Sequence, residues 1–231
     1  MKTILETDDN FICDIKAPCF QTLGPDEVEL VRSAKTQVHF RKGDNLTKQG
    51  AFASYVLFLI DGLVKQYLEG DNNKLYNLKI FQQGDFVGLS SAFSKSTFDY
   101  STVALTDCMA FLIEKEAIGQ VVRQNGLFGF NFIQRYCEQS TGLFSTIRNV
   151  LYKQMNGRLA ATLLYLNGFK AANPKIFYLL SRKDIADFAG ISTESAVKLL
   201  KSFEKDGLIQ LKDKDVIVLD FDKLHEISLR G

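Results

Sequence analysis

The side chains best suited to chemistry in this chain gather at the start of one amphipathic segment, residues 192–205. They comprise two hydroxyls, one carboxylate and two amines, which suit hydrogen bonding to the edges of nucleic-acid bases. In the major groove a carboxylate accepts from cytosine and an ammonium donates to guanine, so this set could read a DNA sequence. The candidate DNA-reading residues are Thr193, Glu194, Ser195, Lys198 and Lys201.

Two capped helices separated by a glycine are predicted to carry these side chains. Ser181 and Asp184 have the spacing of a capping box, and Ser192 can cap the second helix. Gly190 permits a left-handed turn between the helices. The pattern is that of a DNA-binding helix-turn-helix, and the alternative is an ordinary helical hairpin. The apolar positions at helical spacing are Ile185, Phe188, Ala189, Ala196, Leu199, Leu200 and Phe203.

A strand, a turn and a second strand are predicted to follow the helix pair. The apolar runs 208–212 and 216–219 flank a short polar turn. Such a wing lies against the phosphate backbone beside the groove, although a solvated hairpin tip is the alternative for its lysines. The candidate phosphate-binding residues are Lys212 and Lys214, and Arg182 and Lys183 are further candidate DNA-binding residues.

Length and composition predict two domains without a strong basic surface. The chain has 231 residues, 46% of them hydrophobic, and a formal net charge of +1. DNA binding would therefore depend on where the lysines lie, and would weaken readily as salt rises. No apolar run reaches the roughly 18 to 20 residues of a membrane span, and the first residues lack the core of a signal peptide. We expect a cytoplasmic protein that does not bind membranes.

The amino-terminal half has the pattern of an antiparallel barrel or jelly roll. Short apolar runs between residues 36 and 113 are divided by turn signals. A short helix is predicted before them, over 25–34, and the whole effector-sensing domain is predicted to span 1–125. The turn signals lie at 41–44, 48–50, 61–62, 70–73 and 82–85.

A long helix with a heptad seam is predicted over residues 126–155. Its second apolar stripe gives it another surface to bury, so we expect one face on its own barrel and the seam on a second copy. The alternative is a central helix in a monomer. A hinge is predicted near residue 156, and 156–231 is the predicted DNA-binding domain. The fold class is therefore α+β. The candidate dimer-interface residues are Phe130, Ile133, Cys137, Ser140, Phe144, Ile147 and Leu151, and the second stripe is Phe132, Tyr136, Leu143 and Val150.

Barrel, long helix, hinge and winged helix in this order resemble the Crp/Fnr family of bacterial transcription regulators, over essentially the whole chain. Residues 83–88 are similar to the barrel turn of its cyclic-nucleotide-binding domain, 55–62 to the preceding strand and turn, and 156–160 to its hinge. The resemblance implies a homodimer that binds a palindromic operator in double-stranded DNA. It also implies an effector at the contact of barrel and long helix, and RNA polymerase as a further candidate partner.

The residues at the family's effector pocket depart from its cyclic-AMP pattern. In cyclic-nucleotide binders, a Glu after the turn glycine holds the ribose and a later Arg neutralises the phosphate. Here Leu89 follows Gly88, and Phe98 or Asp99 stands at the Arg position. A buried phosphate without a cation is heavily penalised, so we expect an effector other than cyclic AMP. The candidate pocket residues are Gly88, Leu89, Ser90, Phe98, Asp99, Leu143 and Phe144.

This apolar pocket leaves several effectors open. An apolar ligand, a haem, or a barrel filled by its own side chains would each suit it. Lys95 is the one nearby cation that could replace the phosphate anchor.

The cysteines leave a redox, haem or nitric-oxide sensor of the same family as an alternative. Cys13, Cys19 and Cys108 partly match the iron–sulfur ligands of Fnr proteins, but Asn10 stands where another cysteine is needed, and buried inert cysteines are the other interpretation. A ligand-binding module whose tail contacts proteins is a further alternative. No catalytic triad, phosphate loop or zinc spacing is present, so we expect neither an enzyme nor a metal site. The cofactor, the effector and the sign of regulation stay open.

Overall fold

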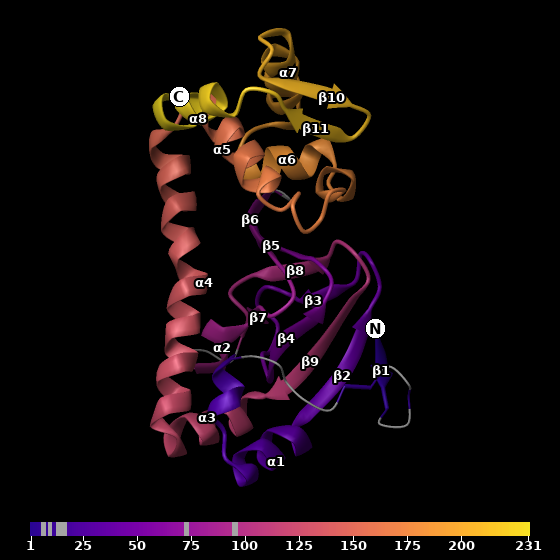
Figure 1. The fold of residues 1–231 in the computed structure, drawn as a ribbon, viewed down its shortest axis with the longest axis vertical. Coiled ribbons are helices and arrows are strands. Elements are labelled where there is room, and N and C mark those ends of the chain that lie inside the picture. Colours follow the sequence, from indigo (N-terminus) through magenta and orange to yellow (C-terminus); the bar gives the residue numbers. More distant parts are fainter. Residues whose placement is uncertain (6–7, 9–10, 13–17, 72–73, 94–96) are drawn as a thin grey trace. The chain divides into compact units, whose positions relative to one another are not determined.

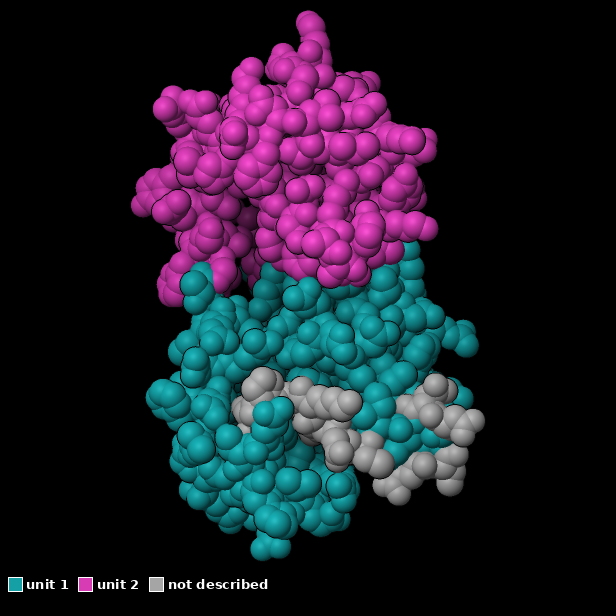
Figure 2. All heavy atoms as spheres, viewed as in Figure 1, with its two compact units in different colours: residues 1–69, 79–141 teal, residues 70–78, 142–231 magenta. Residues whose placement is uncertain are grey.

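The computed structural model describes residues 1–5, 8, 11–12, 18–71, 74–93 and 97–231 (Figure 1). The chain divides into two compact units, drawn in teal and magenta in Figure 2. Unit 1 comprises Met1–Glu69 and Lys79–Thr141, and unit 2 comprises Gly70–Leu78 and Gly142–Gly231. The division falls inside the long helix and inside one strand, and not at the hinge predicted near residue 156.

Unit 1 is built on two antiparallel sheets, as the sequence predicted. The larger sheet has the strand order β1-β2-β9-β4-β7, and the smaller has the order β3-β8-β5-β6. The strands are β1 (Lys2–Ile4), β2 (Lys35–Phe40), β3 (Asn45–Thr47), β4 (Tyr55–Asp61), β5 (Val64–Glu69), β6 (Leu75–Phe81), β7 (Phe86–Val87), β8 (Ser101–Ala104) and β9 (Cys108–Glu114).

Strand β4 shows why both faces of the larger sheet are buried. Successive side chains of a strand point to opposite faces. Leu57 and Leu59 join the cluster that also contains Val64 and Ala104 of the smaller sheet. Val56 and Phe58 join a second cluster on the other face. That strand is therefore an almost continuous apolar run and not an alternating one.

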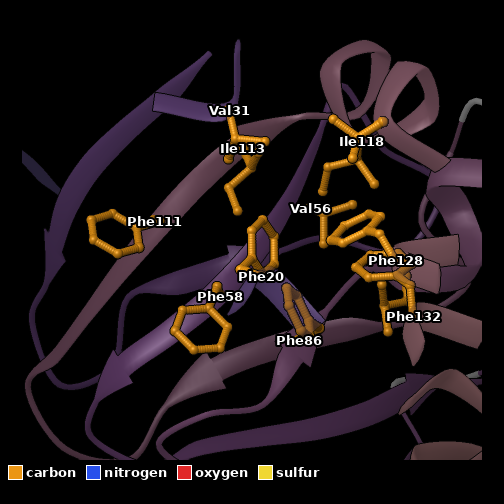
Figure 3. Packing of buried hydrophobic residues seen from close by; sticks show 12 residues of the cluster. Phe20, Val31, Val56, Phe58, Phe86, Phe111, Ile113, Ile118, Phe128 and Phe132 are labelled. Atoms are coloured by element: carbon orange, nitrogen blue, oxygen red, sulfur yellow. The ribbon is translucent and has the colours of Figure 1, made fainter. Parts of the chain in front are cut away.

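Helices of unit 1 supply most of the other residues of the second cluster, together with Phe86 of β7 and Phe111 and Ile113 of β9. Figure 3 shows Phe20, Phe86, Phe128 and Phe132 gathered in it. Phe128 and Phe132 come from the first turns of the long helix α4, so this cluster fixes α4 to the sheet. The helical elements of this unit are η1 (Pro18–Thr22), α1 (Pro25–Ser33), α2 (Leu89–Phe93), α3 (Lys115–Gln124) and the first part of α4 (Gly126–Tyr152).

The long helix ends slightly earlier than predicted. Its last residue is Tyr152, and the next helix already begins at Met155. Asn156 and Gly157 therefore lie in the first turn of a helix, whereas the sequence placed a break there. Neither residue favours the interior of a helix, which is why the pattern misled, but the first turn tolerates both.

Unit 2 contains the helix-turn-helix and the wing that the sequence predicted. Ser181 Oγ accepts a hydrogen bond from the Asp184 amide at 3.0 Å, and the Asp184 carboxylate accepts one from the Ser181 amide at 2.8 Å. Gly190 takes the left-handed conformation, with φ of 62°. Leu199 is only half-buried, although it was expected in the apolar stripe. The elements are α5 (Met155–Asn167), η3 (Ile176–Leu179), α6 (Arg182–Ala189), α7 (Thr193–Lys205), β10 (Ile209–Lys212), β11 (Asp215–Val218) and α8 (Phe221–Arg230).

Residues 70–78 belong to unit 2 because they contact its helix-turn-helix. Asn77 Nδ2 donates to the Asp184 carbonyl at 2.9 Å, and Asn77 is 1% exposed. The Tyr76 ring lies against Gly190, since a Cβ at this glycine would come within 2.8 Å of the ring. No local sequence pattern predicted these contacts.

Substitution of the turn glycine Gly190 tests both its left-handed conformation and its contact with Tyr76. Gly190→Ala is expected to lower the free energy of unfolding by about 1 to 2 kcal/mol because of its positive φ. Crowding of Tyr76 adds roughly 1 to 3 kcal/mol. Gly207→Ala is the matched control, because Gly207 also has a positive φ of 72° but nothing lies within 4 Å of the added Cβ. Chemical denaturation of both variants is the measurement, and equal losses would contradict the crowding.

Candidate nucleic-acid interface and effector region

Helix α7 presents one polar face to solvent and buries the other. Thr193, Glu194, Lys198 and Lys201 are exposed. Ala196, Leu200 and Phe203 are buried on the opposite side. The structure therefore brings four of the five predicted DNA-reading residues together on one accessible surface. The fifth, Ser195, is half-buried, and its hydroxyl accepts a hydrogen bond from the Ser192 hydroxyl at 2.9 Å.

Glu194 and Lys198 form an ion pair across one helical turn. Their charged atoms lie 2.8 Å apart, and the side chains are 78% and 74% exposed. An exposed pair of this kind contributes only about 0 to 1 kcal/mol. Either residue can therefore exchange its partner for a base edge at small cost.

The wing exposes both of its predicted phosphate-binding lysines. Lys212 pairs with Asp215 in the β10–β11 register, so the turn consists of Asp213 and Lys214. Asp213 has a positive φ of 55°, which Asp tolerates better than most residues. Lys212 and Lys214 are exposed on either side of Asp213.

The two basic residues at the start of α6 differ in their surroundings. Lys183 is exposed and pairs with Asp187 at 3.0 Å. Arg182 is half-buried, and its Nη2 donates to the Asp213 carbonyl at 3.1 Å. Its Nη1 is buried and has no hydrogen-bond partner among the described residues. Burial lowers the pKa of the Arg182 guanidinium, and the charge of Asp215 opposes that shift.

Helix α4 leaves most of its predicted seam in solvent. Ser140 is half-buried, and Tyr136 and Leu143 of the second stripe are also exposed, whereas Phe132 is buried in the barrel cluster. The exposed seam residues are Phe130, Ile133, Cys137, Phe144, Ile147 and Leu151.

A polar cluster joins the first half of α4 to the turn before β7. Arg135 Nη2 donates to the Asp85 carboxylate at 3.2 Å, and Gln139 Nε2 donates to the same oxygen at 3.1 Å. Lys79 Nζ donates to the Gln139 carbonyl at 3.0 Å, and burial lowers the pKa of Lys79. The sequence signalled the turn at 82–85 but gave no sign of these partners.

Around Gly88, one of the predicted effector-pocket residues, other side chains of the chain pack against the turn. Gly88 has a positive φ of 86°, and a Cβ there would come within 2.8 Å of the Phe98 ring. Tyr100 Oη accepts a hydrogen bond from the Gly88 amide at 2.8 Å. Phe98 and Leu89 are buried, and Leu89 belongs to the cluster with Phe86. The sequence did not reveal this contact of Tyr100 with the turn.

The other predicted pocket residues do not join this group. Ser90 is half-buried and Asp99 is exposed. Leu143 and Phe144 belong to unit 2, where they are 45% and 75% exposed. Lys95 lies outside the described residues.

Cys108 is a packed thiol. It is 2% exposed, its Sγ donates to the Thr106 carbonyl at 3.2 Å, and burial raises its pKa. Cys13 and the side chain of Cys19 lie outside what the structure describes. The described residues contain no group of three acidic, His or Cys side chains able to hold a metal. Nor does this part of the chain contain a helix long and apolar enough to cross a bilayer.

Comparison with known proteins finds two family models in the chain. The cyclic nucleotide-binding domain matches residues 37–125, and the Crp-like helix-turn-helix domain matches residues 157–227. The anaerobic regulatory protein of Bacillus subtilis is 25% identical over 202 residues, which cover 85% of each chain. The CRP-like cAMP-activated global transcriptional regulator of Mycobacterium tuberculosis is 21% identical over 213 residues, covering 90% of this chain and 95% of its own.

The same architecture occurs in a crystal structure from Eubacterium rectale that is assigned to the crp/fnr family of transcriptional regulators. It matches with a TM-score of 0.77 and 17% identity, over 92% of this chain and 98% of its own.

The ionisation of Tyr100 is expected to make the stability of the protein depend on alkaline pH. Burial raises its pKa from 10.0 to about 12. A folded pKa above the unfolded one gives stability that is complete below pH 10 and falls as pH rises toward 12, by about 2 to 3 kcal/mol in all. Tyr100→Phe is expected to flatten this alkaline fall. It should also cost about 1 to 3 kcal/mol at neutral pH, because the buried Gly88 amide loses its acceptor.

Denaturation at several pH values measures both effects. Tyr55→Phe is the control, since Tyr55 is 38% exposed. An unchanged alkaline profile in Tyr100→Phe would contradict the role assigned to the buried hydroxyl.

Proposed function

The chain belongs to the Crp/Fnr family of transcription regulators, and from that premise we propose that it is a homodimer that binds a specific palindromic DNA sequence. The main support for this proposal is the exposed polar face of α7, a helix capped by Ser192. A recognition helix reads base edges with the residues near its amino end, where Thr193, Glu194 and Lys198 lie. Such a target implies a cytoplasmic location, and RNA polymerase is the further proposed partner.

The exposed seam of α4 supports the dimer. A monomer would leave a long apolar stripe in water, and a second copy of the same helix is the self-complementary surface that covers it. In such a dimer the two recognition helices lie about 34 Å apart, one turn of DNA.

Phosphate contacts from the wing would orient each recognition helix. Lys212 and Lys214 are exposed and can make these contacts. Lys183 and Lys201 are exposed too and are the other candidates for phosphate contacts. The small net charge of the chain means that these few local contacts supply the electrostatic attraction.

We propose that cyclic AMP is not the effector, although a Mycobacterium tuberculosis relative is named as cAMP-activated. Phe98 covers the Gly88 turn, and Tyr100 already pairs with the Gly88 amide. No cation stands at the Phe98 or Asp99 position, so the phosphate would lack neutralisation. Isothermal titration should therefore detect no micromolar binding of cyclic AMP.

Another effector would act where the barrel meets the first half of α4. Asp85, Arg135 and Gln139 already connect these elements, so a ligand that alters this contact would move the long helix. The buried Cys108 thiol, with its raised pKa, disfavours the redox alternative.

Glu194→Ala tests the recognition helix. The change is expected to relax discrimination at one base pair of each half-site by about 1 to 3 kcal/mol, because a carboxylate acceptor for cytosine is lost. Selection of binding sites from a random DNA pool measures it. Glu226→Ala is the matched control, since Glu226 forms the same kind of exposed ion pair, with Arg230 on α8. An unchanged site profile for Glu194→Ala would remove the assignment.

A further inference from the structure

Charged side chains from α6, from α7 and from the turn after α5 hydrogen-bond to the wing. An isolated two-stranded hairpin is marginally stable at best, so β10 and β11 need outside support. Glu204 Oε1, from the last turn of α7, accepts a hydrogen bond from the Leu211 amide at 2.8 Å. Lys170 Nζ donates to the Val216 carbonyl at 2.9 Å. Arg182 Nη2 donates to the carbonyl at the wing's turn, as described above. Each strand and the turn thus receive a hydrogen bond from one of these side chains, in addition to the burial of Ile209 and Val216.

The surroundings of Arg182 do not suit direct phosphate binding. An arginine binds phosphate best when two parallel N–H groups face the anion. Here Nη2 already bonds to Asp213, and Nη1 is buried, away from any solvent-borne anion. Two of the guanidinium nitrogens are therefore not arranged as a free pair of donors for a phosphate.

The carbonyl that accepts from Arg182 belongs to Asp213, and the conformation of Asp213 determines where the two wing lysines lie. Asp213 stands between Lys212 and Lys214, and its positive φ is a conformation that the chain must be held in. A change in this turn would move both ammonium groups relative to the phosphates.

We propose that Arg182 and Glu204 are positioning residues for DNA binding, which act by fixing the wing so that Lys212 and Lys214 meet the phosphate backbone. This inference rests on the proposed function. It departs from the expectation that Arg182 itself contacts DNA. Glu204, an acidic residue, is thereby assigned a favourable effect on DNA affinity.

A double-mutant cycle with salt titration tests the proposal in the full-length protein. Removing both wing lysines should lower the magnitude of the slope of log affinity against log salt by about four, for two phosphates in each protomer. Arg182→Met should lower affinity and slope in the wild-type background, and should have no further effect in the Lys212→Ala/Lys214→Ala background. A direct phosphate ligand would instead lower the slope by about two in both backgrounds, which would overturn the proposal.

Two variants of Glu204 distinguish the effect of its hydrogen bond to the wing from the effect of its negative charge on DNA binding. Glu204→Leu should weaken DNA binding although it removes a negative charge, because the Leu211 amide loses its acceptor. Glu204→Gln is the control, since it keeps an acceptor and should bind at least as tightly as wild type. Tighter binding by Glu204→Leu would overturn the proposal. Lys183→Ala controls for the loss of a positive charge beside Arg182, and its effect should be the same in both lysine backgrounds.

Hydrogen exchange in the free protein gives a readout that does not need DNA. Arg182→Met should speed amide exchange over residues 209–218 while α6 and α7 keep their protection. Unchanged wing exchange would overturn the positioning role. Wild-type protein that binds no DNA, with wing exchange still dependent on Arg182, would instead overturn the proposed function alone.

Discussion

Burial of Phe128 and Phe132 against Phe20 and Phe86 is the interaction on which the rest of the structure depends (Figure 3). The ring centroids of Phe20 and Phe128 lie 5.3 Å apart, as do those of Phe86 and Phe132. This packing fixes the first turns of α4 to the larger sheet. Because a helix has a fixed period, the same packing leaves Phe130 and Ile133, the first residues of the apolar seam, exposed. This exposed start of the seam is the surface on which the proposed dimer depends.

In the barrel, a backbone group that a ligand could bind is paired instead with a side chain of the same chain. In this chain the amide of Gly88 has a buried partner in Tyr100, and its Cα is covered by Phe98. A buried polar group needs one hydrogen-bond partner, and a side chain serves as well as a ligand. The fold and the DNA-binding domain therefore follow from membership of the family. The identity of the effector depends instead on a few side chains around one turn.

Local features were predictable from the sequence, and contacts between distant segments were not. The cap at Asp184 and the left-handed turn at Gly190 depend on neighbouring residues, so the helix-turn-helix could be placed closely. The partners of Tyr100, Arg182 and Asn77 lie far along the chain or on another element, and no periodicity reports them. Arg182 is an example, because its type and position suggest a contact with DNA, whereas its Nη2 donates to the wing at Asp213.

We propose that two copies associate through the seam of α4 and thereby present two α7 helices to one operator. Sedimentation equilibrium of the wild-type chain and of Ile147→Asp tests it most directly. Ile147 is 46% exposed in one protomer, and the substitution would bury two like charges in the dimer. We expect twice the chain mass of 26.0 kDa for the wild type and the single-chain mass for the variant. A variant that remains a dimer, or a wild type that sediments as a monomer, would contradict it.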